Sequence, residues 1–92
     1  MSRVSVIMPA FNSERYIAAS IDSAIGQTMR DFEIIVINDG STDRTEEIVL
    51  AAARANPDRI RYFRQENRGA AAARNLGASH AAGENRQSRI RQ

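Results

Sequence analysis

The chain has 92 residues, 42% of them hydrophobic and 26% charged, so it can form one small domain or part of a larger one and is too apolar to be wholly disordered. The absence of Cys and the presence of one His exclude disulfides, Cys-ligated metals and a His-rich metal site. All 13 basic residues are Arg, and the net charge of +2 lies in residues 83–92, which does not favour a nucleic-acid-binding domain.

No apolar run approaches the ~20 residues of a membrane span, and the apolar stretch near the N-terminus is too short for the core of a signal peptide. We therefore expect no membrane segment and a cytoplasmic location.

In chain order the sequence predicts three strands, each followed by an amphipathic or alanine-rich helix. The strands begin 28 residues apart. Asn12 or Ser13 can cap the first helix, and the second ends before Pro57, as helices do ahead of proline. The six elements are Val4–Met8, Glu14–Ile25, Phe32–Ile37, Asp43–Ala55, Ile60–Arg64 and Ala70–Ala82.

This alternation predicts an α/β fold with parallel strands, because parallel neighbours need helical crossovers. The nearly continuous apolar run Phe32–Ile37 is typical of a strand covered on both faces. We expect a partial Rossmann-like sheet of three βα units with helices on both faces. Gly77, among alanines, is expected to let its helix pack closely on the sheet.

The strand period predicts a fourth strand beginning around residues 84–88, but Ile90 is the one apolar residue of that segment. The sequence therefore predicts that the fourth strand is missing. We expect residues 1–84 to form the fold and residues 85–92 to be an Arg-rich disordered tail.

Ligands of such sheets bind beyond the carboxyl ends of the strands. After the first strand, Phe11 could stack on a base or cover the sheet edge as a core aromatic. After the second strand, the carboxylate of Asp39 could accept hydrogen bonds from a base or a ribose, or form an Asx turn. Gly40 permits a turn with positive φ and a close approach of ligand.

The polar residues after Gly40 have a structural alternative, because Ser41, Thr42 and Asp43 can all cap the following helix. After the third strand, Arg68 and Arg74 could bind an anion or lie on an exposed helix face. No Walker lysine and no GxGxxG motif are present, and His80 is expected to be structural or exposed.

Three ordered motifs resemble the start of the family 2 glycosyltransferases: VSVIMPAFNSE at residues 4–14, EIIVINDGSTD at 33–43 and NRGAAAARNLG at 67–77. The resemblance covers about residues 3–84. It implies a GT-A fold and a nucleotide-sugar donor, whose sugar the family transfers to an acceptor hydroxyl.

The resemblance also implies residue roles around the nucleotide. Phe11 stands where the family usually has a Tyr that packs on the base, and Asp39 stands where an Asp holds a uracil-type base. The other implied nucleotide-site residues shape the pocket, belong to the same motifs or flank the nucleotide: Pro9, Ala10, Asn12, Glu14, Gly40, Ser41, Gly69, Arg74 and Asn75.

The departure from the family begins after Glu84, where relatives continue with a hydrophobic strand that ends in an Asp-x-Asp or Asp-Asp pair. That pair binds Mn²⁺ or Mg²⁺ and the donor diphosphate. Since this chain has an Arg-rich segment there, we expect no catalytic residue, no metal site and no cofactor in it, and no transfer by the chain alone. A shifted reading frame in a GC-rich gene would produce such a segment.

The favoured function is thus binding of the nucleotide part of a donor, expected to be of UDP type, by a truncated glycosyltransferase domain. The alternative is a non-catalytic small α/β module that binds nucleotides or proteins. A missing fourth strand would expose a sheet edge, through which the chain could self-associate. Nucleic acid is not expected as a partner.

Overall fold

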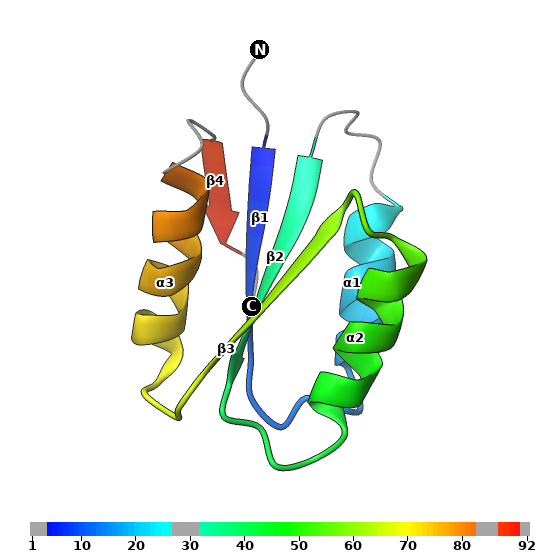
Figure 1. Cartoon of the computed structure of the whole chain (residues 1–92), viewed down its shortest axis with the longest axis vertical. Helices are drawn as coiled ribbons and strands as arrows, with labels where there is room; N and C mark the ends of the chain where they lie inside the picture. The colour runs from blue at the N-terminus through cyan, green and yellow to red at the C-terminus, as the bar shows by residue number, and fades with distance from the viewer. Residues whose placement is uncertain (1–3, 27–31, 83–86, 91–92) are drawn as a thin grey trace.

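The computed structural model describes residues 4–26, 32–82 and 87–90, and shows one layer of parallel strands with helices on both sides (Figure 1). Three βα units follow one another, as the sequence predicts, and the first three strands start at the predicted residues. The elements are β1 (Val4–Ala10), α1 (Ile17–Ile25), β2 (Phe32–Asp39), α2 (Thr45–Ala55), β3 (Ile60–Gln65), α3 (Ala70–Ala82) and β4 (Gln87–Ile90).

The four strands are parallel and lie in the order β3-β2-β1-β4. In the register, Val4 of β1 pairs with Phe32 of β2, and Ile34 of β2 pairs with Ile60 of β3. Strand β2 is central and all eight of its residues are buried, as its continuous apolar sequence predicts. The expected Rossmann-like α/β class is confirmed.

The fourth strand corrects one expectation. Residues 87–90 form β4, which pairs in parallel with residues 4–7 of β1, so the prediction of a missing strand is wrong, as is the prediction of disorder for these four residues. Backbone N–H and C=O groups make this pairing whatever the side chains are, and a short end strand can be polar. The other residues of the 85–92 segment lie outside the described ranges.

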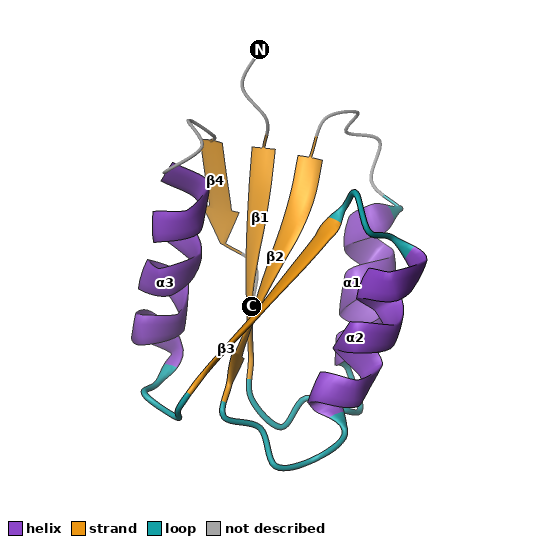
Figure 2. Ribbon diagram, viewed as in Figure 1, coloured by secondary structure: helices purple, strands orange, loops and turns teal. Residues whose placement is uncertain are grey.

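Helices α1 and α2 cover one face of the sheet and α3 covers the other (Figure 2). On the first face, Ile17 and Ile21 of α1 are buried against alternate residues of β1 and β2, as their spacing predicts. On the second face, Ile35 and Ile37 of β2 pack with small residues of α3. Within the described ranges, no helix is long and apolar enough to cross a bilayer.

Close packing of α3 depends on Gly77. A Cβ added at Gly77 would lie 2.5 Å from Cγ2 of the fully buried Ile7 on β1, well inside contact distance. The predicted role of Gly77 is therefore confirmed. Nearby, the ring of His80 stacks on Phe63 of β3 with 3.8 Å between the ring centroids, which makes His80 structural as expected.

Candidate functional site

The site lies at the edge of the sheet where the strands end, and Figure 2 shows the loops after β1, β2 and β3 gathered at that edge. The chain crosses the sheet from β1 to β3 with α1 and α2 on one face. It then returns along the opposite face as α3 and enters β4 on the other side of β1. The strand order thus reverses beside β1, which is where open α/β sheets bind their ligands.

A pocket of about 220 Å³ opens at this point. Its volume is below the ~300–1,000 Å³ of sites that enclose a whole drug-sized ligand, so it suits part of a nucleotide. The ends of β1 and β2 and the first turns of α3 supply its lining: Pro9, Ala10, Phe11, Asp39, Ala70 and Arg74. Ala70 is the one lining residue that the sequence reasoning missed, although its position four residues before Arg74 places it on the same face of α3.

Phe11 forms an aromatic wall of the pocket. Its side chain is 50% exposed and belongs to neither hydrophobic core cluster. The alternative of a core aromatic that covers the sheet edge is therefore wrong, and the ring is available to a ligand.

Asp39 lies at the end of β2 and is 4% exposed. Its Oδ1 accepts hydrogen bonds from Gln65 Nε2 at 2.8 Å and from the backbone N–H of Arg68 at 2.7 Å, and its Oδ2 accepts one from the N–H of Gly69 at 2.9 Å. Burial raises the pKa of Asp39, but these three hydrogen bonds outweigh it, so the pKa lies below the ordinary value of 3.8. The carboxylate is thus ionised at neutral pH and fixes the start of α3.

The two glycines of the site have positive φ, 73° at Gly40 and 96° at Gly69, a conformation that side chains rarely adopt. A Cβ added at Gly40 would lie 2.8 Å from the backbone N of Asn67. In this structure Gly40 therefore lets the loops after β2 and β3 approach each other. Neither glycine lines the pocket, and Gly69 contributes its N–H to Asp39.

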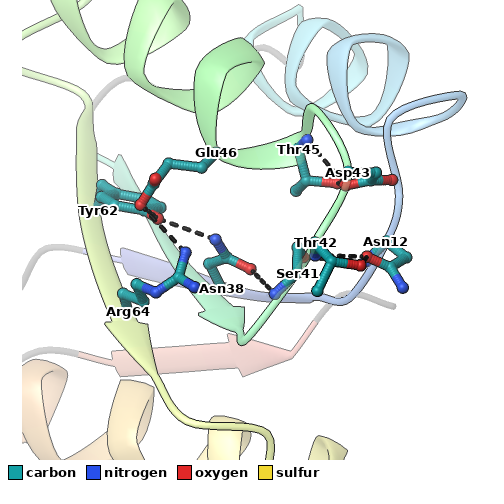
Figure 3. Close-up of polar contacts among 9 residues, drawn as sticks. All are labelled: Asn12, Asn38, Ser41, Thr42, Asp43, Thr45, Glu46, Tyr62 and Arg64. Carbon is teal, nitrogen blue, oxygen red and sulfur yellow. Dashed lines mark hydrogen bonds and ion pairs between the residues drawn. The ribbon is translucent and has the colours of Figure 1, made fainter.

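Asn12 and Ser41 join the loop after β1 to the loop after β2 by hydrogen bonds, and neither residue lines the pocket. The N–H of Asn12 donates to Ser41 Oγ at 2.9 Å, and Asn12 Oδ1 accepts from the N–H of Thr42 at 2.8 Å. Figure 3 shows these side chains turned toward one another. Ser41 and Thr42 do not cap α2, so that prediction is wrong for them.

Capping at the two helix starts differs from expectation in part. Asp43 Oδ1 accepts a hydrogen bond from the N–H of Thr45, the first residue of α2, at 2.9 Å. Asp43 thus satisfies one N–H group of the helix start, but it lies one position before the N-cap residue Arg44, whose side chain makes no capping bond. Neither Asn12 nor Ser13 caps α1 with its side chain, since Ser13 Oγ binds the backbone of Phe11. The Asx-type contact foreseen for Asp39 is made by its neighbour, because Asn38 Oδ1 accepts from the N–H of Ser41.

Asn38 also belongs to a polar network that the sequence did not reveal. Its Nδ2 donates to the hydroxyl of Tyr62 at 2.9 Å, and that hydroxyl donates to Glu46 Oε2 at 2.6 Å (Figure 3). Arg64 lies 3.3 Å from the same carboxylate oxygen. Burial and, next, Glu46 raise the pKa of Tyr62, whereas the Tyr62 hydroxyl and then Arg64 lower the pKa of Glu46.

The remaining predicted residues lie away from the pocket lining. Glu14 and Asn75 are exposed, and the backbone N–H of Glu14 donates to Asp43 Oδ2 at 3.1 Å. Arg68 is exposed and contributes its backbone N–H to Asp39. The structure thus brings Phe11, Asp39 and Arg74 together in the pocket. It leaves Glu14, Arg68 and Asn75 outside the pocket lining.

The residues of the pocket do not form a set of ligands for a divalent cation. Among residues 4–26, 32–82 and 87–90, no three His, Asp or Glu side chains gather closely enough to hold an ion. Asp39, the acidic residue of the pocket, already receives N–H donors at both oxygens. Since Mn²⁺ and Mg²⁺ need several oxygen ligands, these residues do not fit a divalent cation.

A doubly wound parallel sheet with a pocket at its switch point is the architecture of nucleotide-binding α/β proteins. Residues 5–85 match the model of glycosyl transferase family 2, and the chain belongs to this family.

Curated relatives agree with the family. The chain is 46% identical over 81 residues to an uncharacterised glycosyltransferase of Rickettsia typhi, with 88% of this chain and 24% of the relative aligned. It is 43% identical over 81 residues to the glycosyltransferase GlyA of Streptococcus pneumoniae, with 88% and 12% aligned. The chain therefore spans about a quarter of the length of its relatives, or less.

Solved structures agree with the fold. The mannosyltransferase PcManGT from Pyrobaculum calidifontis, in complex with GDP-Man and Mn²⁺, superposes with a TM-score of 0.79 at 32% identity, over 85% of this chain and 24% of that one. Staphylococcus aureus TarS, residues 1–349, gives a TM-score of 0.73 at 32% identity, over 84% and 23%.

Proposed function

We propose that the pocket at the carboxyl edge of the sheet binds the nucleotide part of a nucleotide-sugar donor. The observation that carries this proposal is the meeting of a half-exposed aromatic ring, an ionised carboxylate and an arginine at the switch point. Phe11 offers a face on which a base can stack. Arg74, on α3, offers a fork of donors for the diphosphate.

The hydrogen bonds of Asp39 favour a uracil-type base. A carboxylate oxygen has about two acceptor positions. Oδ1 accepts two N–H groups from the protein and Oδ2 accepts one, so Oδ2 retains about one position for a ligand. Uracil presents a single N–H on its pairing edge, whereas guanine presents adjacent N–H groups and would leave a donor unpaired. We therefore propose UDP rather than GDP as the preferred nucleotide.

The family reaction, transfer of a sugar from a nucleotide-diphosphate donor to an acceptor hydroxyl, is our proposal for the complete protein. We propose that the 92-residue chain alone does not catalyse it, since its pocket carries one carboxylate, which is engaged by protein N–H groups. Any metal ion used by the complete protein would be held by residues outside the described ranges. Self-association through a sheet edge and a cytoplasmic location stay predictions.

The proposal is tested by calorimetric titration of UDP into the chain and into Phe11→Ala. We expect millimolar binding by the wild type and roughly tenfold weaker binding by Phe11→Ala, since base stacking on an aromatic ring contributes about 1–3 kcal/mol. Phe11→Tyr is the matched control and should bind as the wild type does, because it keeps the ring. Equal UDP affinity of Phe11→Ala and the wild type would contradict the proposed pocket.

A further inference from the structure

Phe11 must be positioned by its backbone, because half of its side chain is exposed and it lies outside both core clusters. Locally, its N–H and C=O both hydrogen bond to Ser13 Oγ, at 3.3 and 3.1 Å. These bonds shape the turn after β1 but do not attach it to the rest of the molecule.

Three consecutive backbone N–H groups attach this turn to the loop after β2. Those of Asn12, Ser13 and Glu14 donate to side chains of the segment 41–45, at 2.9, 2.8 and 3.1 Å. We call these three bonds the loop clasp; the acceptors, in that order, are Ser41 Oγ, Thr45 Oγ1 and Asp43 Oδ2. None of the acceptor residues lines the pocket.

Thr45 is the buried centre of the clasp, with none of its surface exposed. Its hydroxyl lies 2.6 Å from Asp43 Oδ1, and a carboxylate can only accept, so the hydroxyl proton points to Asp43 (Figure 3). The lone pairs of Thr45 Oγ1 are thereby directed to the N–H of Ser13. Asp43 thus both orients Thr45 and binds the next N–H of the turn, that of Glu14.

We propose that Thr45 is a positioning residue of the nucleotide pocket, which acts through the loop clasp to hold Phe11 in place for stacking. The proposal rests on the proposed function, since it concerns affinity for the nucleotide. It assigns to the polar residues after Gly40 the task of fixing the loop that presents the aromatic ring.

The test compares Thr45→Val with Thr45→Ser in the full 92-residue chain. Valine has nearly the shape of threonine but leaves the N–H of Ser13 without its acceptor, whereas serine keeps the hydroxyl. The two measurements are amide hydrogen exchange at Ser13 and Glu14 and the affinity for UDP. Thr45→Val should exchange faster at both amides and bind UDP roughly tenfold more weakly. Thr45→Ser should stay within about twofold of the wild type in both.

Asp43→Asn supplies a second variant if Thr45→Val does not fold. Asp43 is only half-buried, and the amide keeps one acceptor oxygen where the carboxylate has two, so one clasp bond is lost. Faster exchange at Glu14 together with weaker UDP binding supports the proposal.

The positioning role is overturned if amide hydrogen exchange in the variants is unchanged. It is also overturned if exchange is faster but the affinity for UDP is unchanged. Either result leaves the proposal of nucleotide binding intact. Absence of UDP binding by the wild type would instead overturn the proposed function, and the positioning role with it. The two failures are therefore distinguishable.

Discussion

Asp39 joins two loops that are far apart in the sequence. It follows β2, yet its three hydrogen-bond donors come from residues 65–69, at the end of β3 and before α3. The side chain of Asn67 adds a bond to the backbone C=O of Asp39 at 3.1 Å. The ionised carboxylate therefore stabilises the folded state as well as facing the pocket.

This dual role predicts acid sensitivity. Since the pKa of Asp39 in the folded state lies below 3.8, its contribution to stability is complete above that pH and is lost as the pH falls through the lower folded-state value. Asp39→Asn should cost about 1–3 kcal/mol at neutral pH, because an acceptor for charge-assisted hydrogen bonds is lost. It should then lose less stability than the wild type as the pH falls below 3.8.

Urea unfolding at several pH values measures both effects. Asp22→Asn removes the same charge from an exposed site on α1 and controls for the change in net charge. A wild type and an Asp39→Asn variant that lose equal stability over this pH range would show that the Asp39 hydrogen bonds do not act as described.

At the scale of elements, α3 is held by small residues. Ala73 and Ala81 are fully buried, and Gly77 has no room for a side chain beside Ile7. An alanine-rich helix can therefore approach the sheet closely and bring Arg74 to the pocket. The packing of the helix and the geometry of the site are coupled in this way.

Gly77→Ala should destabilise the fold even though alanine favours helix formation. The overlap with Ile7 is expected to cost about 1–3 kcal/mol, against a gain of about 1 kcal/mol in helix propensity. Thermal unfolding should show a midpoint several degrees lower, while Ser79→Ala, at an exposed position of the same helix, should leave it nearly unchanged. A midpoint raised by Gly77→Ala would mean that α3 does not pack this closely.

The sequence predicts elements well where one residue pattern recurs along the chain. Periodic apolar residues locate β1 to β3 and α1 to α3, and strand ends locate Phe11 and Asp39 at one edge. It fails for β4, whose pairing uses backbone groups that have no side-chain signature. It also misses Tyr62 and Thr45, because their polar partners lie 24 and 32 residues away and can be recognised only once the sheet is formed.

At the scale of the whole molecule, the chain belongs to glycosyl transferase family 2 and spans about a quarter of the relatives it matches, or less. Its four parallel strands already place the switch point beside β1, with the ends of β1 and β2 and the start of α3 around one pocket. We therefore expect nucleotide recognition to be separable from sugar transfer, with the former present in this chain alone.

A titration of the isotope-labelled chain with UDP, followed by the backbone and side-chain resonances of each residue, tests this claim most directly. The account predicts shifts at millimolar UDP that are concentrated at Phe11, Asp39, Ala70 and Arg74, and smaller shifts with GDP. Resonances of these residues that stay unmoved at millimolar UDP, or shifts centred elsewhere on the fold, would contradict it.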